Sequence, residues 1–200
     1  LFKDAAFDWK IVDAKGIQSI FSVKAPHYLS FSTEDNDRSR MNLGFVFQHL
    51  DLYFSANGLG SCWLGFTKPN DSSLLRYPFQ ASLAFGLPAE SLHRQLTEFR
   101  RKPLSEISRG DDKRLQAVSL APSAHNTQAW YFISEQERLH CYQTQPPILA
   151  NLFLRKLTAI DMGIALCHLA VASAHFGIPF ALKQVKNPPT VENGTYIGTC

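Results

Sequence analysis

Two short segments of this chain combine glycine or proline, small hydroxyl residues and a tryptophan, namely residues 58–66 and 121–130. Glycines let a backbone approach a ligand closely, and a tryptophan offers a flat apolar surface. A hydrophobic core needs no such combination. The chemistry that suits both segments is the binding of a flat tricyclic ring with a phosphate tail. Such a ring needs a backbone surface, a donor at its edge, amide groups for its polar rim and cations for its phosphate.

The first segment carries the candidates for the surface against the ring: Gly60, Cys62, Trp63, Leu64 and Gly65. In this interpretation the glycines permit close approach, and the N–H of Leu64 or Gly65 donates to the ring. The alternative is a helix end followed by a buried strand, which accounts for Gly58 but leaves Trp63 without a reason. We therefore favour a binding site at this segment.

The second segment carries the candidates for the polar side of the ligand: Pro122, Ser123, Ala124, Asn126 and Gln128. The amide of Asn126 offers both a donor and an acceptor, and Ser123 can cap a turn or contact the chain attached to the ring. The alternative is a helix end followed by an Asx turn, with Trp130 opening a core strand. That alternative suits Gln128 and Trp130 better than it suits Ser123 and Asn126.

A dense basic run, Arg100, Arg101 and Lys102, provides the candidate phosphate ligands. Alternate side chains of an extended segment point the same way, so Arg100 and Lys102 are expected to converge on one phosphate. A solvated surface is the alternative. His49 and His168 fall inside predicted buried helices, and we interpret them as core histidines with satisfied hydrogen bonds.

Two nearly continuous apolar segments, residues 42–57 and 161–176, predict buried helices that each end at a glycine. A glycine near the start of each segment suggests that the two helix backbones approach closely. A shift of 119 positions superposes four pairs: Gly44 on Gly163, His49 on His168, Leu50 on Leu169 and Gly58 on Gly177. These matches predict an internal duplication with a pseudo-twofold axis, in which residues 1–108 and 109–200 form homologous halves.

Strand patterns flank both helices. Residues 8–13 and 17–21 read as one hairpin, and residues 130–134 and 138–142 read as a second hairpin around a polar turn. Residues 79–86 read as a further buried strand. Helices that alternate with strand pairs predict an α+β fold.

The bulk composition is that of an ordinary globular protein, with 45% hydrophobic and 18% charged residues among 200. A formal charge of +3 argues against nucleic acid and membrane surfaces as partners. The start of the chain does not read as a signal peptide, and we see no apolar run approaching the roughly 20 residues that cross a bilayer. The four cysteines are scattered without metal-binding spacing, which predicts reduced thiols, no metal site and a cytoplasmic protein. Minimal motifs of hydrolases, zinc enzymes, kinases and Rossmann dehydrogenases are missing.

With these residues in view, the chain resembles the nitroreductase-like flavoproteins, in particular the branch in which two subunit-like halves are fused. Residues 58–65 match the GLGxCWxG stretch of that family, and residues 121–130 are similar to its APSxxNxQPW signature, with Ala129 in place of the proline. Residues 100–104 look like its closing basic segment. The family's arginine-rich segment does not precede Phe7, so the chain looks like a fragment or a shortened member.

The resemblance implies a nitroreductase-like fold and one FMN site per chain, formed by the two segments and the basic run. It further implies transfer of electrons from NADH or NADPH to a nitro compound, a quinone or a similar small acceptor, with the flavin rather than a side chain as the reacting group. We expect a monomer that acts as a pseudo-dimer, with a homodimer as the alternative. The alternative functions are a flavin- or ligand-binding protein without turnover and a purely structural interaction module.

Overall fold

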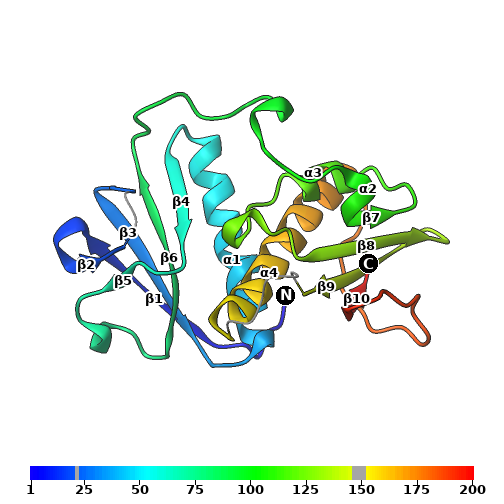
Figure 1. Ribbon diagram of the computed structural model, residues 1–200, viewed down its shortest axis with the longest axis horizontal. Coiled ribbons are helices and arrows are strands. Elements are labelled where there is room, and N and C mark those ends of the chain that lie inside the picture. Colours follow the sequence, from blue (N-terminus) through cyan, green and yellow to red (C-terminus); the bar gives the residue numbers. More distant parts are fainter. Residues whose placement is uncertain (21–22, 146–151) are drawn as a thin grey trace.

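Two long helices lie side by side between two sheets in this computed structural model, which describes residues 1–20, 23–145 and 152–200 (Figure 1). The helices are α1 (Asp37–Ala56) and α4 (Leu152–His175). The main hydrophobic core joins both helices to both sheets, and a smaller cluster contains Tyr28, Leu64 and Ala84. The mixed helix and sheet class predicted from the sequence is confirmed.

Both helices end in the same hydrogen-bond pattern. After α1, Gly58 donates to Ser55 O and Leu59 donates to Phe54 O; after α4, Gly177 donates to Ala174 O and Ile178 donates to Ser173 O. Gly58 and Gly177 have φ of 77° and 68°, in the left-handed region that glycine adopts without steric cost. These are Schellman ends, as the closing glycines predict.

The expected close approach of the two helix backbones occurs at the paired glycines. A Cβ on Gly44 would collide with the carbonyl oxygen of Ile160, and a Cβ on Gly163 would collide with that of Met41. The helices can therefore cross at this short distance only where both lack side chains.

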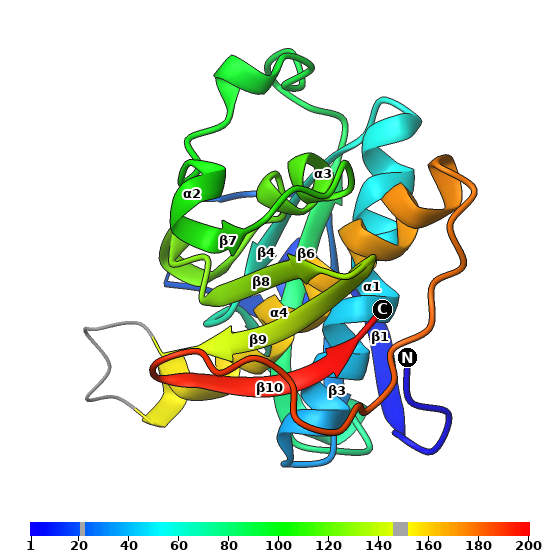
Figure 2. The ribbon, with the colours of Figure 1, turned by 90° about the vertical axis from the view of Figure 1, so that its right-hand side faces the viewer.

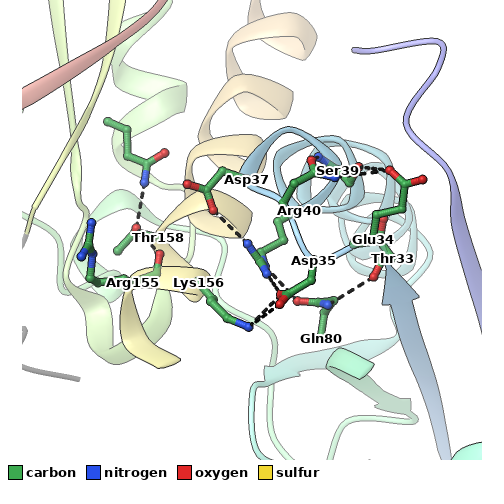
Figure 3. A network of polar contacts seen from close by, with 12 residues as sticks. Thr33, Glu34, Asp35, Asp37, Ser39, Arg40, Gln80, Arg155, Lys156 and Thr158 are labelled. Atoms are coloured by element: carbon green, nitrogen blue, oxygen red, sulfur yellow. Dashed lines mark hydrogen bonds and ion pairs between the residues drawn. The ribbon is translucent and has the colours of Figure 1, made fainter. Parts of the chain in front are cut away.

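A polar network holds the beginning of α1 to its neighbours (Figure 3). The buried guanidinium of Arg40 pairs with Asp35 and Asp37, and its Nε donates to Gln80 Oε1 of β6 at 3.1 Å. Asp35 also pairs with Lys156 of α4 at 2.7 Å. The network thus connects the start of α1 to the first sheet and to α4.

The first sheet has the order β1-β3-β6-β4 and is antiparallel throughout. The second has the order β10-β9-β8-β7, with only the β7·β8 pair parallel, and faces the viewer in Figure 2. The bounds of these strands are β1 Phe7–Asp13, β3 His27–Thr33, β4 Gly60–Leu64, β6 Phe79–Gly86, β7 Ser108–Arg109, β8 Trp130–Glu135, β9 Arg138–Thr144 and β10 Gly194–Thr199. The remaining elements are β2 Ile17–Gln18, β5 Lys68–Pro69, α2 Leu104–Ile107, α3 Leu115–Ser119 and the 3-10 turns η1 Ala14–Gly16, η2 Ser72–Leu74, η3 Leu96–Glu98 and η4 Ala124–Asn126.

The two sheets are traced by the chain in the same order. In the first, β1 and β3 are followed by α1, then β4, then β6, which lies between β3 and β4. In the second, β8 and β9 are followed by α4, then Lys183, then β10, which pairs with β9 and bridges Lys183 through Thr199. Where the first sheet has the five-residue strand β4, the second sheet has the single β-bridge between Lys183 and Thr199.

The predicted hairpin of residues 8–13 with 17–21 is wrong. The carboxylate of Asp13 accepts from the N–H groups of Lys15 and Gly16, which closes a 3-10 turn and sends the chain away from β1. Strand β1 pairs instead with β3, from Phe7↔Thr33 to Asp13↔His27, and β2 pairs with β5.

Strand β3 was not predicted, because buried hydroxyl residues interrupt its apolar pattern. Ser30, for example, is fully buried and pairs with Ser82 of β6, with an Oγ···Oγ distance of 2.9 Å. The second predicted hairpin is confirmed as β8 and β9, and the predicted strand of residues 79–86 is confirmed as β6.

Contrary to our reading of the sequence, α4 includes a span, Arg155–His175, that is long and apolar enough to cross a bilayer by length and composition. In the folded chain 83% of its apolar window is buried. Its apolar character is therefore that of a core helix between two sheets.

Candidate functional site

A cavity of about 540 Å³ opens where β4, the first half of α4 and the segment around η4 meet. This volume falls within the range of small-molecule and cofactor sites. Both segments singled out in the sequence contribute to its wall, although they lie far apart along the chain. The predicted residues that line it are Cys62, Trp63, Leu64, Gly65, Arg101, Pro122, Ser123, Ala124 and Asn126; those that do not are Gly60, Arg100, Lys102 and Gln128.

Strand β4 provides one wall as the edge of the first sheet. It pairs with β6 from Gly60↔Gly86 to Leu64↔Ser82, and the described part of the chain places no strand on its other side. An edge strand leaves every second backbone N–H and C=O free of ladder bonds, so β4 has donors available for a ligand. Gly60 has a packing role, since a Cβ there would lie 3.2 Å from Pro88 Cβ in the turn after β6.

Trp63 is fixed by a hydrogen-bond chain that crosses between α1 and α4. Its Nε1 donates to Gln48 Oε1 at 3.0 Å, and Gln48 Nε2 donates to Asp51 at 2.8 Å and contacts His168 Nε2 at 3.1 Å. An amide nitrogen can only donate, so His168 Nε2 accepts and the ring proton lies on Nδ1, which donates to Ala117 O at 2.9 Å. Burial lowers the pKa of His168 to about 4, so this histidine is neutral near pH 7.

The interpretation of His168 as a satisfied core residue is confirmed, and that of His49 is wrong. His49 lies on α1 beside α4, where its Nδ1 is 3.2 Å from Cys167 Sγ, but its side chain is exposed and is not part of the core. Its Nδ1 lies 2.8 Å from Phe45 O, one helical turn earlier.

The segment around η4 forms the opposite wall in a strained conformation. His125, Asn126 and Gln128 have φ of 52°, 55° and 47°, which costs residues other than glycine about 1–3 kcal/mol each. Two bonds hold this conformation: Ser123 Oγ accepts from Gln128 N at 2.9 Å, and Gln128 Oε1 accepts from Lys102 N at 2.9 Å. Gln128 and Ser123 therefore shape the loop, and Gln128 does so from behind the wall.

The basic run is attached to this strained loop. Asn126 Nδ2 donates to Arg100 O at 2.8 Å, and Lys102 Nζ donates to Thr127 O at 2.8 Å. Arg101 alone of the three lines the cavity, with Nη1 bonded to Asn126 Oδ1 at 3.1 Å. Arg100 and Lys102 do not converge on the cavity as expected. The basic run is bonded to the loop on both sides of Arg101, and this places Arg101 in the cavity wall.

Arg101 has no acidic partner within ion-pair distance among the residues that the structure describes. Its Nε and Nη2 are each 3.3 Å from Leu120 O, so the guanidinium is held by a carbonyl and an amide. Burial lowers its pKa from the ordinary value, and the group stays charged near pH 7. A half-buried cation without a counter-ion favours an anionic ligand.

Two carboxyl groups in the cavity wall were not among the predicted site residues. Asp51 accepts from Ser61 and Gln48, and burial raises its pKa. Asp161 is 4% exposed, and among the described residues it accepts only from Ala124 N, at 3.1 Å to each oxygen; burial raises its pKa to about 7. The available signal for Asp161 was an acidic residue inside an otherwise apolar helix.

No cluster of three or more histidine, cysteine or acidic side chains that could hold a metal ion occurs in the described ranges. The site thus offers backbone donors, one cation, the buried carboxyl of Asp161, the half-buried carboxyl of Asp51, and an apolar floor from Leu157, Ile160 and Ile164.

Comparisons with known proteins identify the fold and the family of the chain. A search of curated proteins found no match. Among solved structures the chain is similar to a protein described as a putative nitroreductase from Thermotoga maritima, with a TM-score of 0.64 and 20% identity over 94% of this chain and 75% of that chain. This likeness shows a nitroreductase-like fold. A family profile described as "Putative TM nitroreductase" matches residues 2–173. The chain therefore belongs to this nitroreductase family, whose members point to oxidoreductase chemistry.

Proposed function

We propose that this chain is an FMN-dependent oxidoreductase that passes electrons from NADH or NADPH to nitro compounds, quinones or similar small acceptors. The observation that carries the proposal is the cavity itself. It joins residues 61–66 and 122–126 with Arg101 around one space of cofactor size.

The residues present fit FMN. Backbone donors on the free edge of β4 suit the polar edge of a flat ring, and Ile160 and Ile164 of α4 offer an apolar surface. Arg101, with no acidic partner among the described residues, suits a phosphate, and Arg100 and Lys102 add positive charge nearby. When bound, FMN would supply two-electron transfer at its ring. The chain's own residues would bind and orient the ring, exclude water and polarise it through backbone N–H groups.

We further propose that residues 1–108 and 109–200 are homologous halves and that one chain acts as a pseudo-dimer with one FMN site. The identical helix ends at a shift of 119 positions and the shared strand order support this proposal. The single bridge at Lys183, where the first half has β4, supports one site per chain. The proposed boundary lies inside β7, which pairs with β8 in the second sheet.

Two measurements test the proposed function. Titration of FMN with the purified chain should quench flavin fluorescence at a stoichiometry of one, and anaerobic mixing of the complex with NADH or NADPH should bleach the flavin absorbance. A chain that quenches no flavin removes the proposal. A chain that binds FMN but leaves it oxidised with both nucleotides would instead be a flavin-binding protein without turnover.

A further inference from the structure

Asp161 on α4 and Asn42 on α1 occupy matching places in the fold. Each lies two residues before the glycine at the helix crossing, and each side chain is 4% exposed. Each accepts a backbone N–H from a segment that leads into a strand: Asn42 from Phe2, before β1, at 2.9 Å, and Asp161 from Ala124, before β8, at 3.1 Å. The same helix position therefore anchors the same kind of segment twice.

The two side chains differ in what they leave unsatisfied. The amide of Asn42 uses both ends within the chain, since its Nδ2 also contacts Ala5 O at 3.4 Å. The carboxyl of Asp161 lines the cavity and, within the described ranges of the chain, receives only the N–H of Ala124. A buried carboxylate with a single donor is costly unless it gains a proton or a further partner.

In the part of the chain that the structure describes, no charged group forms an ion pair with Asp161. The other titratable or charged groups of the cavity are Asp51, Cys62, Arg101 and His125, and none of them pairs with it. On its own helix, Lys156 pairs with Asp35, and His168 is neutral. The facing part of α1 contributes Met41 and Gly44, which do not titrate. The causes that act on the pKa of Asp161 are burial, which raises it to about 7, and the Ala124 N–H, which opposes that rise.

We propose that Asp161 contacts the ligand in the cavity, takes up a proton from solvent when the ligand binds, and donates its O–H to an acceptor atom on the ligand. This inference rests on the proposed function only in taking a flavin as that ligand; any planar heteroaromatic ring with a carbonyl or ring-nitrogen acceptor meets the same chemistry. A ligand that fills the cavity removes the remaining water from the carboxyl, which makes the ionised form still less favourable.

A proton taken up on binding makes affinity depend on pH in a defined direction. Below the pKa of free Asp161 the group is already neutral, and affinity is flat. Above that pKa the proton must come from solvent, so the dissociation constant rises as pH rises, by up to about tenfold per pH unit. Wild-type affinity should therefore weaken from about pH 7 upward.

The test uses riboflavin as well as FMN, because riboflavin has no phosphate whose own ionisation changes with pH. Dissociation constants from fluorescence quenching are measured from pH 6 to 9 for the wild type, Asp161→Asn and Asp51→Asn. We expect a rise of up to about tenfold per unit above pH 7 in the wild type and in Asp51→Asn, and a flat profile in Asp161→Asn. The same rise in Asp161→Asn as in the wild type, or its loss in Asp51→Asn alone, overturns the inference.

A second measurement needs no variant. Riboflavin binding to the wild type is followed calorimetrically at pH 8 in buffers of different ionisation enthalpy, and the slope reports the protons exchanged. Net uptake approaching one proton is expected. Binding with no proton uptake overturns the role of Asp161 and leaves the proposed FMN site standing. A failure of both flavins to bind removes the proposed function and this inference together.

Discussion

Helices α1 and α4 are built alike but carry different chemistry. Both cross at a glycine, both end in a Schellman motif, and both hold a preceding segment through a buried polar side chain. On α1 that side chain is Asn42, whose two ends are bonded within the chain, whereas on α4 it is Asp161, which faces the cavity. At this position both helices share what packing requires, and α4 adds a carboxyl that faces the ligand cavity.

The sheets repeat this contrast. Strand β4 presents a free edge to the cavity, while the matching place in the second sheet is a bridge between Lys183 and Thr199. The first sheet thus provides the free backbone edge of β4. The second half of the chain contributes the loop around η4 and the carboxyl of Asp161. If the two halves are homologous, as proposed, both have retained the packing of the helix and sheet. The ligand site then needs residues from both halves together.

The largest expected effect comes from the shared packing. Gly44→Ala and Gly163→Ala should each destabilise the chain by about 4 kcal/mol or prevent folding, because the new Cβ meets a backbone carbonyl that cannot move aside. Urea unfolding followed by circular dichroism measures this. Gly58→Ala is the matched control: it has open space and only the cost of its positive φ, about 1 kcal/mol. Equal losses at Gly58 and Gly44 would refute the close crossing.

The difference between Asn42 and Asp161 predicts a pH effect on stability. Asp161 has a raised pKa of about 7, so it favours the folded state at low pH, and that contribution is lost as pH rises from about 4 to 7. Asp161→Asn should therefore be more stable than the wild type at pH 8, by about 4 kcal/mol, with the difference disappearing near pH 4. Unfolding free energies at pH 4, 6 and 8 measure it. A constant difference at all three pH values would contradict the prediction.

His168 on the same helix should act in the opposite sense. Its pKa is lowered to about 4, so its contribution to stability is present above pH 6.5 and is lost as pH falls toward 4. In Asp161→Asn the opposing effect is gone, so acidification from pH 6.5 to 4 should lower stability by roughly 2–3 kcal/mol. His168→Gln in that background should flatten the profile. If stability still falls between pH 6.5 and 4 after this second substitution, groups other than His168 cause the pH dependence.

The contrast within the basic run can be tested by affinity for FMN. Arg101→Ala should weaken FMN binding by roughly 10- to 100-fold, since a charge-assisted bond to phosphate contributes about 1.5–3 kcal/mol. The double variant Arg100→Ala with Lys102→Ala, whose wild-type side chains do not line the cavity, should have a smaller effect. Riboflavin should bind all three proteins equally. A larger loss of FMN affinity in the double variant would mean that Arg100 and Lys102, and not Arg101, bind the phosphate.

The smallest effect concerns the bond that ties β4 to α1. Trp63→Phe removes the Nε1–H that donates to Gln48 and should cost about 1 kcal/mol of stability. Trp9→Phe, on the exposed face of β1, is the control and should change stability by less than about 0.5 kcal/mol. Thermal unfolding compares the two. Identical melting temperatures would mean that the Gln48 bond contributes nothing measurable.

Patterns that act locally were readable from the amino-acid sequence. Continuous apolar runs predicted α1 and α4, their closing glycines predicted the Schellman ends, and β8, β9 and β6 followed from strand patterns. These features depend on neighbouring residues, through period, turn chemistry and left-handed glycine. The pairing of segments 58–66 and 121–130 was also anticipated, through residue types typical of one family.

Features that depend on distant partners were decided by tertiary structure. Strand β3 was hidden because its hydroxyl groups are satisfied only by a neighbouring strand, and β1 pairs with β3 because Asp13 turns the chain away from its expected partner. Arg101 rather than Arg100 or Lys102 faces the cavity because the strained loop around Asn126 fixes the direction of the run.

Asp161 shows the same division most clearly. The sequence by itself determined that an acidic residue stands in an apolar helix, two positions before a glycine that another helix must cross. Only the fold decided that this carboxyl is buried, receives a single N–H and opens onto a cavity. The physical reason is that burial and the number of hydrogen-bond partners, which set the cost of a charge, belong to the assembled surroundings and not to the residue.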